Sequence, residues 1–202
     1  MSGEGPSGAG LFSPGVERAL RTAFEAHEGQ TRKGDPIPYV THSVHVALIL
    51  ARAGADEITL QAGLLHDVVE DCPGWTAERI EELFGSEVAG AVAAVTETKG
   101  QSWEQRKQAA LDHVPHMDER AVALKAADKT HNMRSLTAKL DAATPEVAWK
   151  PFSRGPEATI DYAERLVAAL RARLAEFPKL ASLSEDLQGA YDALEAHRPK
   201  GE

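Results

Sequence analysis

Apolar residues recur every three to four positions along most of this chain, which is the spacing of amphipathic α-helices. We find no segment of useful length in which apolar and polar residues alternate as they do in a β-strand. The pattern therefore predicts an all-α fold. The helices are expected at about residues 13–29, 42–52, 56–72, 76–85, 86–95, from 102 onward, 118–136, 157–175 and 184–196.

Residues that favour helix ends support these boundaries. Ser13 precedes Pro14, so the first helix has a capping hydroxyl and a proline at its first position. Ser102 and Gln105 match a capping box, in which each side chain bonds the other residue's backbone N–H. Residues 32–41 contain Gly and Pro at several positions and are predicted to form a loop, as is the connection over 145–156.

A chain of 202 residues is long enough for one domain with a complete core. Residues 1–12 are rich in Gly and Ser and are predicted to be a disordered tail, 13–197 the domain, and 198–202 a flexible C-terminus. The tail contains the spacing G-x-G-x-x-G at Gly3, Gly5 and Gly8. We reject it as a dinucleotide site because no strand precedes it.

The net charge of −9 argues against a nucleic-acid partner, because such binding depends on Lys and Arg contacts to phosphates. A small anionic substrate remains compatible, since a metal ion and a few local cations can reverse the potential inside a pocket. The single cysteine, Cys72, excludes an internal disulfide and fits a reducing cytoplasm. We find no membrane span and no signal peptide.

The segment from Leu64 to Asp71 reads LLHDVVED and carries the strongest chemical signal. On a helical wheel His66, Asp67, Glu70 and Asp71 fall within an arc of roughly 140°. An imidazole and a carboxylate can bind one divalent cation, and the second pair of carboxylates lies one turn away. An exposed acidic stripe at a helix end is the alternative interpretation. Buried charges are costly unless they are paired or bind a metal, and the flanking sequence is apolar.

Two further segments offer compatible groups. Asp128, Asn132 and Ser135 share one helical face, on which they could supply a metal ligand and two substrate contacts or simply form a solvated surface. His42 opens a helix behind the predicted loop, and either His42 or His45 could point inward. Together His42, His66, Asp67 and Asp128 would form a mixed nitrogen and oxygen site. Such a set suits Mn²⁺, Fe²⁺ or Zn²⁺ better than Ca²⁺.

These motifs resemble the HD-domain superfamily of metal-dependent phosphohydrolases, and within it the hydrolase domain of RelA/SpoT-type enzymes and the single-domain small alarmone hydrolases. The resemblance covers about residues 16–175. Its matching segments are Arg32-Lys33 before 38–42 (PYVTH), 62–71 (AGLLHDVVED), Phe84-Gly85 with Val95-Thr96, and 125–134 (KAADKTHNMR). The resemblance implies a single HD-domain bundle of about eight to ten helices.

The resemblance also implies roles for individual residues. His42, His66, Asp67 and Asp128 would bind one Mn²⁺. Glu70 and Asp71 would handle the attacking water and proton transfer to the leaving oxygen. The substrate would be a small nucleotide, ppGpp or pppGpp, which loses its 3′ pyrophosphate to give GDP or GTP. Residues expected to bind it are Arg32 at the purine, Lys33 at phosphate, Asn132 and Ser135 at the sugar, and Lys99, with Arg106, as an extension of the phosphate pocket.

Three departures from the family pattern affect packing or local backbone rather than ligands: Ser43 stands where Pro is usual, Cys72 where Thr is usual, and Ala126 where Leu is usual. Two other functions remain open. One is an HD phosphohydrolase for a different phosphorylated nucleotide, such as an adenine alarmone, a nucleoside monophosphate or the 2′-phosphate of NADPH. The other is a nucleotide-binding regulator without turnover. The sequence leaves the oligomeric state open.

Overall fold

The computed structural model describes residues 13–32, 34–97 and 100–199, and these residues form an all-α fold, as predicted. Within them the extended structure amounts to an isolated bridge between Thr31 and Pro38. The predicted disordered tail, 1–12, and the last residues, 200–202, lie outside the described part. At the described C-terminal end, Arg198 donates to the carboxylates of Asp161 and Glu195.

The first half of the chain forms short and medium helices. Their bounds are α1 (Pro14–Ala26), α2 (Val40–Arg52), α3 (Glu57–Leu65), α4 (Val68–Asp71), α5 (Ala77–Phe84) and α6 (Ser86–Ala93). The second half contains the longest helices. Their bounds are α7 (Trp103–His113), α8 (Glu119–Ala142), α9 (Pro145–Trp149), α10 (Gly155–Leu174) and α11 (Ala181–Glu195), with 3₁₀ turns at Val114–His116 and Pro178–Leu180.

The predicted helix caps are confirmed. The hydroxyl of Ser13 accepts a bond from the backbone N–H of Val16, and Pro14 is the first residue of α1. Ser102 and Gln105 form both bonds of the capping box at the start of α7. Asp118 caps α8, the helix that carries Asp128. Each side chain satisfies a backbone donor that the first helical turn leaves without an intrahelical partner.

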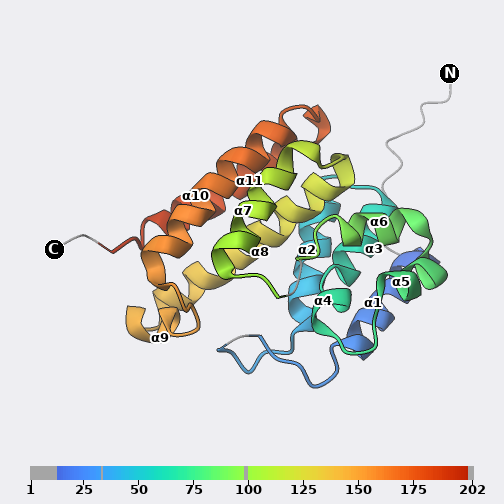
Figure 1. Cartoon of the computed structure of the whole chain (residues 1–202), viewed down its shortest axis with the longest axis horizontal. Helices are drawn as coiled ribbons and strands as arrows, with labels where there is room; N and C mark the ends of the chain where they lie inside the picture. The colour runs from blue at the N-terminus through green and yellow to red at the C-terminus, as the bar shows by residue number, and fades with distance from the viewer. Residues whose placement is uncertain (1–12, 33, 98–99, 200–202) are drawn as a thin grey trace.

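Helix α8 is central to the bundle. Figure 1 shows α10 and α11 alongside it, α2 beside it, and α1, α3, α5 and α6 on the other side of α2. All residues from Ala121 to Asp128 are buried, so this part of α8 is covered on every side. Four of them are alanines, which let the neighbouring helices approach closely. The side chains that the bundle buries most completely include Leu50, Leu60, Leu124, Leu170, Leu183 and Leu187.

A glycine lies where α3 packs against α2. A Cβ atom added at Gly63 would lie 2.7 Å from Leu50 Cδ1 and 3.6 Å from the Cα atom of Ala47. Real Cβ atoms do not approach other atoms as closely as 2.7 Å, so a larger residue at position 63 would displace the buried Leu50 side chain, whereas the backbone of α2 lies at ordinary contact distance. Since His42 lies on α2 and His66 follows α3, the packing of these two helices positions two candidate ligands.

The prediction of one helix from Asp56 to residue 72 is wrong, because the helix is interrupted at His66-Asp67. α3 ends at Leu65 and α4 begins at Val68. His66 Nδ1 lies 2.9 Å from the carbonyl oxygen of Gly63, the acceptor that the Asp67 N–H would use in a continuous helix. The other ring nitrogen of His66, Nε2, lies 3.0 Å from Asp67 Oδ2.

Two smaller differences concern segments predicted to be loops. α2 begins at Val40, two residues before the predicted start, so His42 belongs to its first turn. The connection over 145–156 contains the short helix α9. None of the helices in the described part of the chain combines the length and apolar character that a bilayer crossing requires.

The packing of α11 against α8 predicts a specific loss of stability. Leu187 is fully buried on α11, and Leu187→Ala leaves a cavity that the core fills only in part. We expect the free energy of unfolding to fall by about 2–5 kcal/mol. Leu48→Ala is the matched control, because Leu48 is also helical but 54% exposed, and we expect a change within about 0.5 kcal/mol. Denaturant unfolding of both variants measures this; equal losses would contradict the assignment of the core.

Candidate active site

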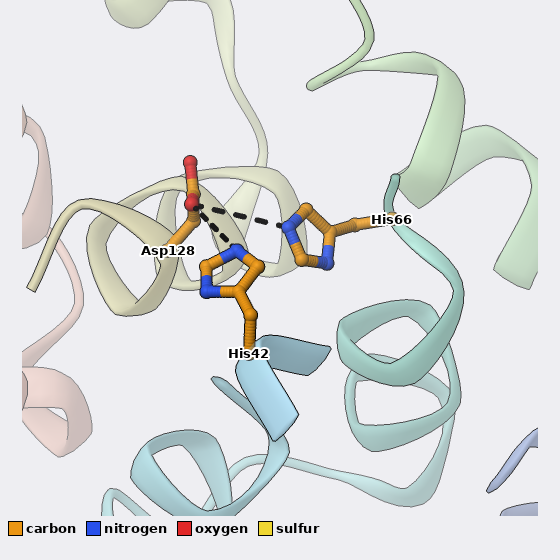
Figure 2. A group of neighbouring side chains, drawn as sticks. All are labelled: His42, His66 and Asp128. Atoms are coloured by element: carbon orange, nitrogen blue, oxygen red, sulfur yellow. Dashed lines mark ion pairs between the residues drawn. The ribbon is translucent and has the colours of Figure 1, made fainter. Parts of the chain in front are cut away.

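Four candidate metal ligands converge from three parts of the fold. His42 comes from α2, His66 and Asp67 from the α3–α4 junction, and Asp128 from α8. Figure 2 shows the two imidazoles turned toward the Asp128 carboxylate. Ligand atoms of His42, His66 and Asp128 all lie within 4.8 Å of one another.

Asp67 completes this cluster through one oxygen. Asp67 Oδ2 lies 3.4 Å from His42 Nε2 and 3.0 Å from His66 Nε2, while Asp128 Oδ1 lies 3.3 Å and 3.9 Å from the same two nitrogens. The structure also decides between the two histidines of α2 that the sequence left open. His42 is 1% exposed and points into the cluster, whereas His45 is exposed.

The side chain of His66 fits a metal ligand. Its Nδ1 faces the Gly63 carbonyl oxygen at 2.9 Å, so the ring proton belongs on Nδ1. Its Nε2 is then left with a lone pair; it is buried, lies among the two carboxylates and makes no hydrogen bond. A histidine that donates one ring N–H to a carbonyl and presents the other nitrogen is the usual form of a metal-binding imidazole.

The electrostatics of the cluster favour a cation. Burial by itself would lower the pKa of His66, but the Asp67 carboxylate raises it to about 9. Burial likewise opposes ionisation of Asp67, yet the neighbouring His66 and His42 hold the pKa of Asp67 well below its ordinary value. The site thus attracts positive charge strongly, and a divalent metal competes with a proton for His66 Nε2.

Other side chains hold the two carboxylates in place. The Tyr39 hydroxyl donates to Asp67 Oδ2 at 2.6 Å. Lys129 lies 2.9 Å from Asp128 Oδ2. Burial by itself would raise the pKa of Asp128, but Lys129 and His42 hold it well below its ordinary value. The amide of Asn132 donates to Asp128 Oδ1. Partners of this kind fix the orientation of metal ligands.

Glu70 lies one turn beyond Asp67 and is held by backbone. Its Oε2 accepts a bond from the N–H of Glu97 at 3.1 Å. Burial raises the pKa of Glu70 above its ordinary value, and the nearby carboxylates of Asp67 and Glu97 add to this effect although the bond from Glu97 opposes it. A carboxyl group with a raised pKa can exchange a proton nearer to neutral pH.

A cavity of about 490 Å³ opens beside the cluster. Four residues expected at the site line it: Arg32, Asp71, Asn132 and Ser135. Its volume is in the usual range for a small-molecule site. Arg32 is joined to the metal cluster through Asn132, because Arg32 donates to Asn132 Oδ1 at 2.7 Å and Asn132 donates to Asp128.

Several cavity residues were not assigned a role from the sequence. Lys107 and Lys129 add positive charge, and Phe152, Tyr162 and Leu166 form an apolar wall from α10 and the segment before it. Lys129 and Tyr39 lie within the recognised motifs at 125–134 and 38–42, so their positions alone could have suggested them. The residues of α7 and α10 carry no such signal, because only the tertiary fold brings these helices over the site.

Of the three remaining residues expected to bind substrate, the structure describes only Arg106. Lys33 and Lys99 lie outside the described residues. Arg106 is paired with Glu97 at 2.8 Å and lines a second cavity of about 240 Å³.

The three departures from the family pattern all fall on packed positions. Ser43 and Ala126 are fully buried. Cys72 is a buried free thiol whose Sγ lies 3.3 Å from His27 Nδ1. None of the three is among the candidate ligands.

Comparisons with known proteins agree with this geometry. A family model described as HD domain matches residues 19–153, and the chain belongs to this family. The guanosine-3′,5′-bis(diphosphate) 3′-pyrophosphohydrolase MESH1 of Danio rerio is 37% identical over 153 residues, which cover 74% of this chain and 80% of that protein. The bifunctional (p)ppGpp synthase/hydrolase SpoT of Escherichia coli K12 is 42% identical over 127 residues, 60% of this chain.

The match to SpoT covers only 18% of that protein, so this chain corresponds to a fraction of the bifunctional relative. Among solved structures, a metazoan ortholog of SpoT described as hydrolysing ppGpp superposes with a TM-score of 0.73 at 32% identity. That match covers 89% of this chain and 95% of the other. The similarity therefore extends over nearly the whole fold.

A buried lysine near the cluster predicts a pH effect. Lys125 is 5% exposed and donates to the carbonyl oxygen of Val95, which ties α8 to the segment that holds Glu70. Burial, with Lys129 nearby, lowers the pKa of Lys125 from 10.5 to about 8. Between these pH values the unfolded chain binds the proton and the folded chain does not, so the free energy of unfolding rises with pH.

Lys125→Met should remove this contribution while keeping the apolar stem. From pH 8 to 10.5 we expect the unfolding free energy of the parent to rise relative to the variant by at most about 3 kcal/mol. Denaturant titrations of the two metal-free proteins across this range measure the difference. If the difference in unfolding free energy between the parent and the variant does not change over this pH range, the lowered pKa of Lys125 is contradicted.

Proposed function

We propose that this protein is a metal-dependent hydrolase that removes the 3′ pyrophosphate of guanosine alarmones, converting ppGpp or pppGpp to GDP or GTP. The observation that carries the proposal is the convergence of His42, His66, Asp67 and Asp128 beside a cavity lined by cations. The names of MESH1 and SpoT and the solved metazoan structure support the same substrate class. We assign the activity to one HD domain over residues 13–197, acting on a small molecule in the cytoplasm.

We propose Mn²⁺ as the metal, held by the two imidazoles and the two aspartates. The mixed nitrogen and oxygen donors and the lone pair on His66 Nε2 fit a transition metal of this kind. When bound, such a metal polarises a phosphoryl oxygen and lowers the pKa of a coordinated water. Tyr39 and Lys129 keep the aspartates oriented toward it.

Glu70 and Asp71 are proposed to orient the attacking water and to move the proton to the leaving oxygen. Glu70 is fixed by the Glu97 N–H and has a raised pKa, which suits proton transfer near neutral pH. Asp71 lines the cavity and so faces bound substrate. The pair follows Asp67 by three and four residues, within reach of a reacting group at the metal.

The remaining residues are proposed to bind the nucleotide. Arg32 lies over the Tyr39 ring with its Cζ atom 5.3 Å from the ring centroid, so its guanidinium plane is placed to stack on or clamp a purine. Asn132 and Ser135 face the sugar. Lys129 and Lys107 offset charge on the phosphoryl oxygens. From the motifs alone, Lys33 and Lys99 are assigned to phosphate.

The direct test is to incubate the purified protein with ppGpp and Mn²⁺, with and without EDTA, and to resolve the nucleotide products. We expect GDP and pyrophosphate, and no turnover with EDTA. GDP, which has no 3′ phosphate, should not be consumed. Intact ppGpp in a sample that binds Mn²⁺ would overturn the substrate assignment, and turnover of another phosphorylated nucleotide in a parallel panel would replace it. Tight ppGpp binding without product would identify a regulator.

A paired substitution tests the mechanism. Glu70→Gln with Asp71→Asn keeps the shape of both side chains and removes both proton-transfer groups, so we expect kcat to fall by about 10²–10⁴-fold. The matched control is Glu81→Gln with Glu82→Gln, because these neighbouring carboxylates are exposed on α5. Mn²⁺ binding should persist in both proteins. Unchanged turnover in the first pair would contradict the assigned roles.

A further inference from the structure

Three imidazoles form a continuous chain from the metal cluster to the surface. His42 Nδ1 lies 2.7 Å from His131 Nδ1, and His131 Nε2 lies 3.1 Å from His45 Nδ1. The ring centroids of each successive pair are 4.8 Å apart. The chain crosses between helices twice, since His42 and His45 belong to α2 and His131 to α8.

The contacts allow only one arrangement of protons when His42 binds a metal. His42 Nε2 faces Asp67 and Asp128, so it must offer a lone pair to the metal and carry its proton on Nδ1. His131 Nδ1 must then accept that proton's hydrogen bond, which puts the His131 proton on Nε2. That N–H in turn donates to His45 Nδ1.

We propose that His131, held by His45, is a positioning residue that fixes the tautomer and ring orientation of the metal ligand His42. The inference rests on the proposed metal centre and adds the reason why His42 presents Nε2 to it. The tautomer of His66 is fixed in a different way, because the backbone carbonyl of Gly63 accepts its Nδ1–H. His42 instead receives its acceptor from α8, the helix that also supplies Asp128.

Because α8 carries both Asp128 and His131, the positions of the ligands Asp128 and His42 are coupled. His131 follows Asp128 by three residues on α8, so one helix carries both a direct ligand and the acceptor for another ligand. A displacement of α8 would disturb both groups together. Partners that bond to the second nitrogen of a metal-binding histidine typically contribute about 10–100-fold to metal affinity.

Two substitutions of nearly equal shape separate this role from simple packing. His131→Asn keeps an acceptor oxygen close to the Nδ1 position, whereas His131→Leu has no acceptor and no loss of helix propensity. The measurement is Mn²⁺ binding followed by the electron paramagnetic resonance signal of the free ion, which does not depend on turnover. His116→Ala is the control, because His116 is an exposed histidine outside the chain of imidazoles.

We expect His131→Leu to weaken Mn²⁺ binding by about 10–100-fold, with kcat largely restored at saturating metal. His131→Asn should stay close to the parent. Equal affinity in all three proteins, or equal losses in Asn and Leu, would overturn the positioning role. A parent protein that binds no Mn²⁺ would overturn the metal centre itself, and the role of His131 with it.

A spectroscopic measurement on the parent protein applies even if His131→Leu fails to fold. In the protein loaded with Zn²⁺, a diamagnetic probe, two-bond ¹H–¹⁵N spectra of the histidine rings report which nitrogen carries each proton. We expect His42 with its proton on Nδ1 and His131 with its proton on Nε2. A His131 proton on Nδ1 would overturn the proposal, because two N–H groups cannot face each other at 2.7 Å.

Discussion

Two carboxylates in the helical core, the buried Asp128 and the partly buried Asp67, set the constraint on which the rest of this structure depends. A buried carboxylate is costly unless a cation or several donors compensate it. Here the compensation comes from different helices: His42 from α2, His66 from the end of α3, and Lys129 from α8 itself. The bundle must therefore bring these three elements together. The small residues at their contacts, Gly63 and the alanines of α8, permit that approach.

The same constraint explains the interruption between α3 and α4. The His66 ring faces the Gly63 carbonyl oxygen, the acceptor that the interruption leaves without the Asp67 N–H. Its Nε2 then lies 3.0 Å from Asp67 Oδ2, so the adjacent imidazole and carboxylate face each other. The local cost in helical hydrogen bonding is thus offset within the same residue. Asp67 is the N-cap residue of α4, and its carbonyl oxygen accepts the N–H of Asp71 at 2.8 Å.

The sequence predicted the helices well, because apolar periodicity and capping residues are local signals. It also selected the four candidate ligands. It missed the helix interruption, since LLHDVVED has neither Gly nor Pro to mark it and the interruption depends on a side-chain bond to a carbonyl. Helical periodicity could not choose between His42 and His45, because both positions are compatible with one amphipathic helix, and the choice of His42 came from the family resemblance. The apolar cavity wall from α10 is a tertiary feature, so no local pattern indicated it.

The cavity shows how an acidic chain can receive an anionic substrate. The net charge is −9, yet Arg32, Lys107 and Lys129 all line one cavity. Each of these cations is already held by an acceptor of the protein: Arg32 by Asn132, Lys107 by Glu97, and Lys129 by Asp128. Their side chains are therefore ordered before a ligand arrives, which reduces the entropy lost on binding. Because two of the three acceptors are carboxylates, their negative charge compensates the repulsion between the cations that line the cavity. Since Lys129 also bonds Asp128, the network that orders the cavity extends to the candidate metal site.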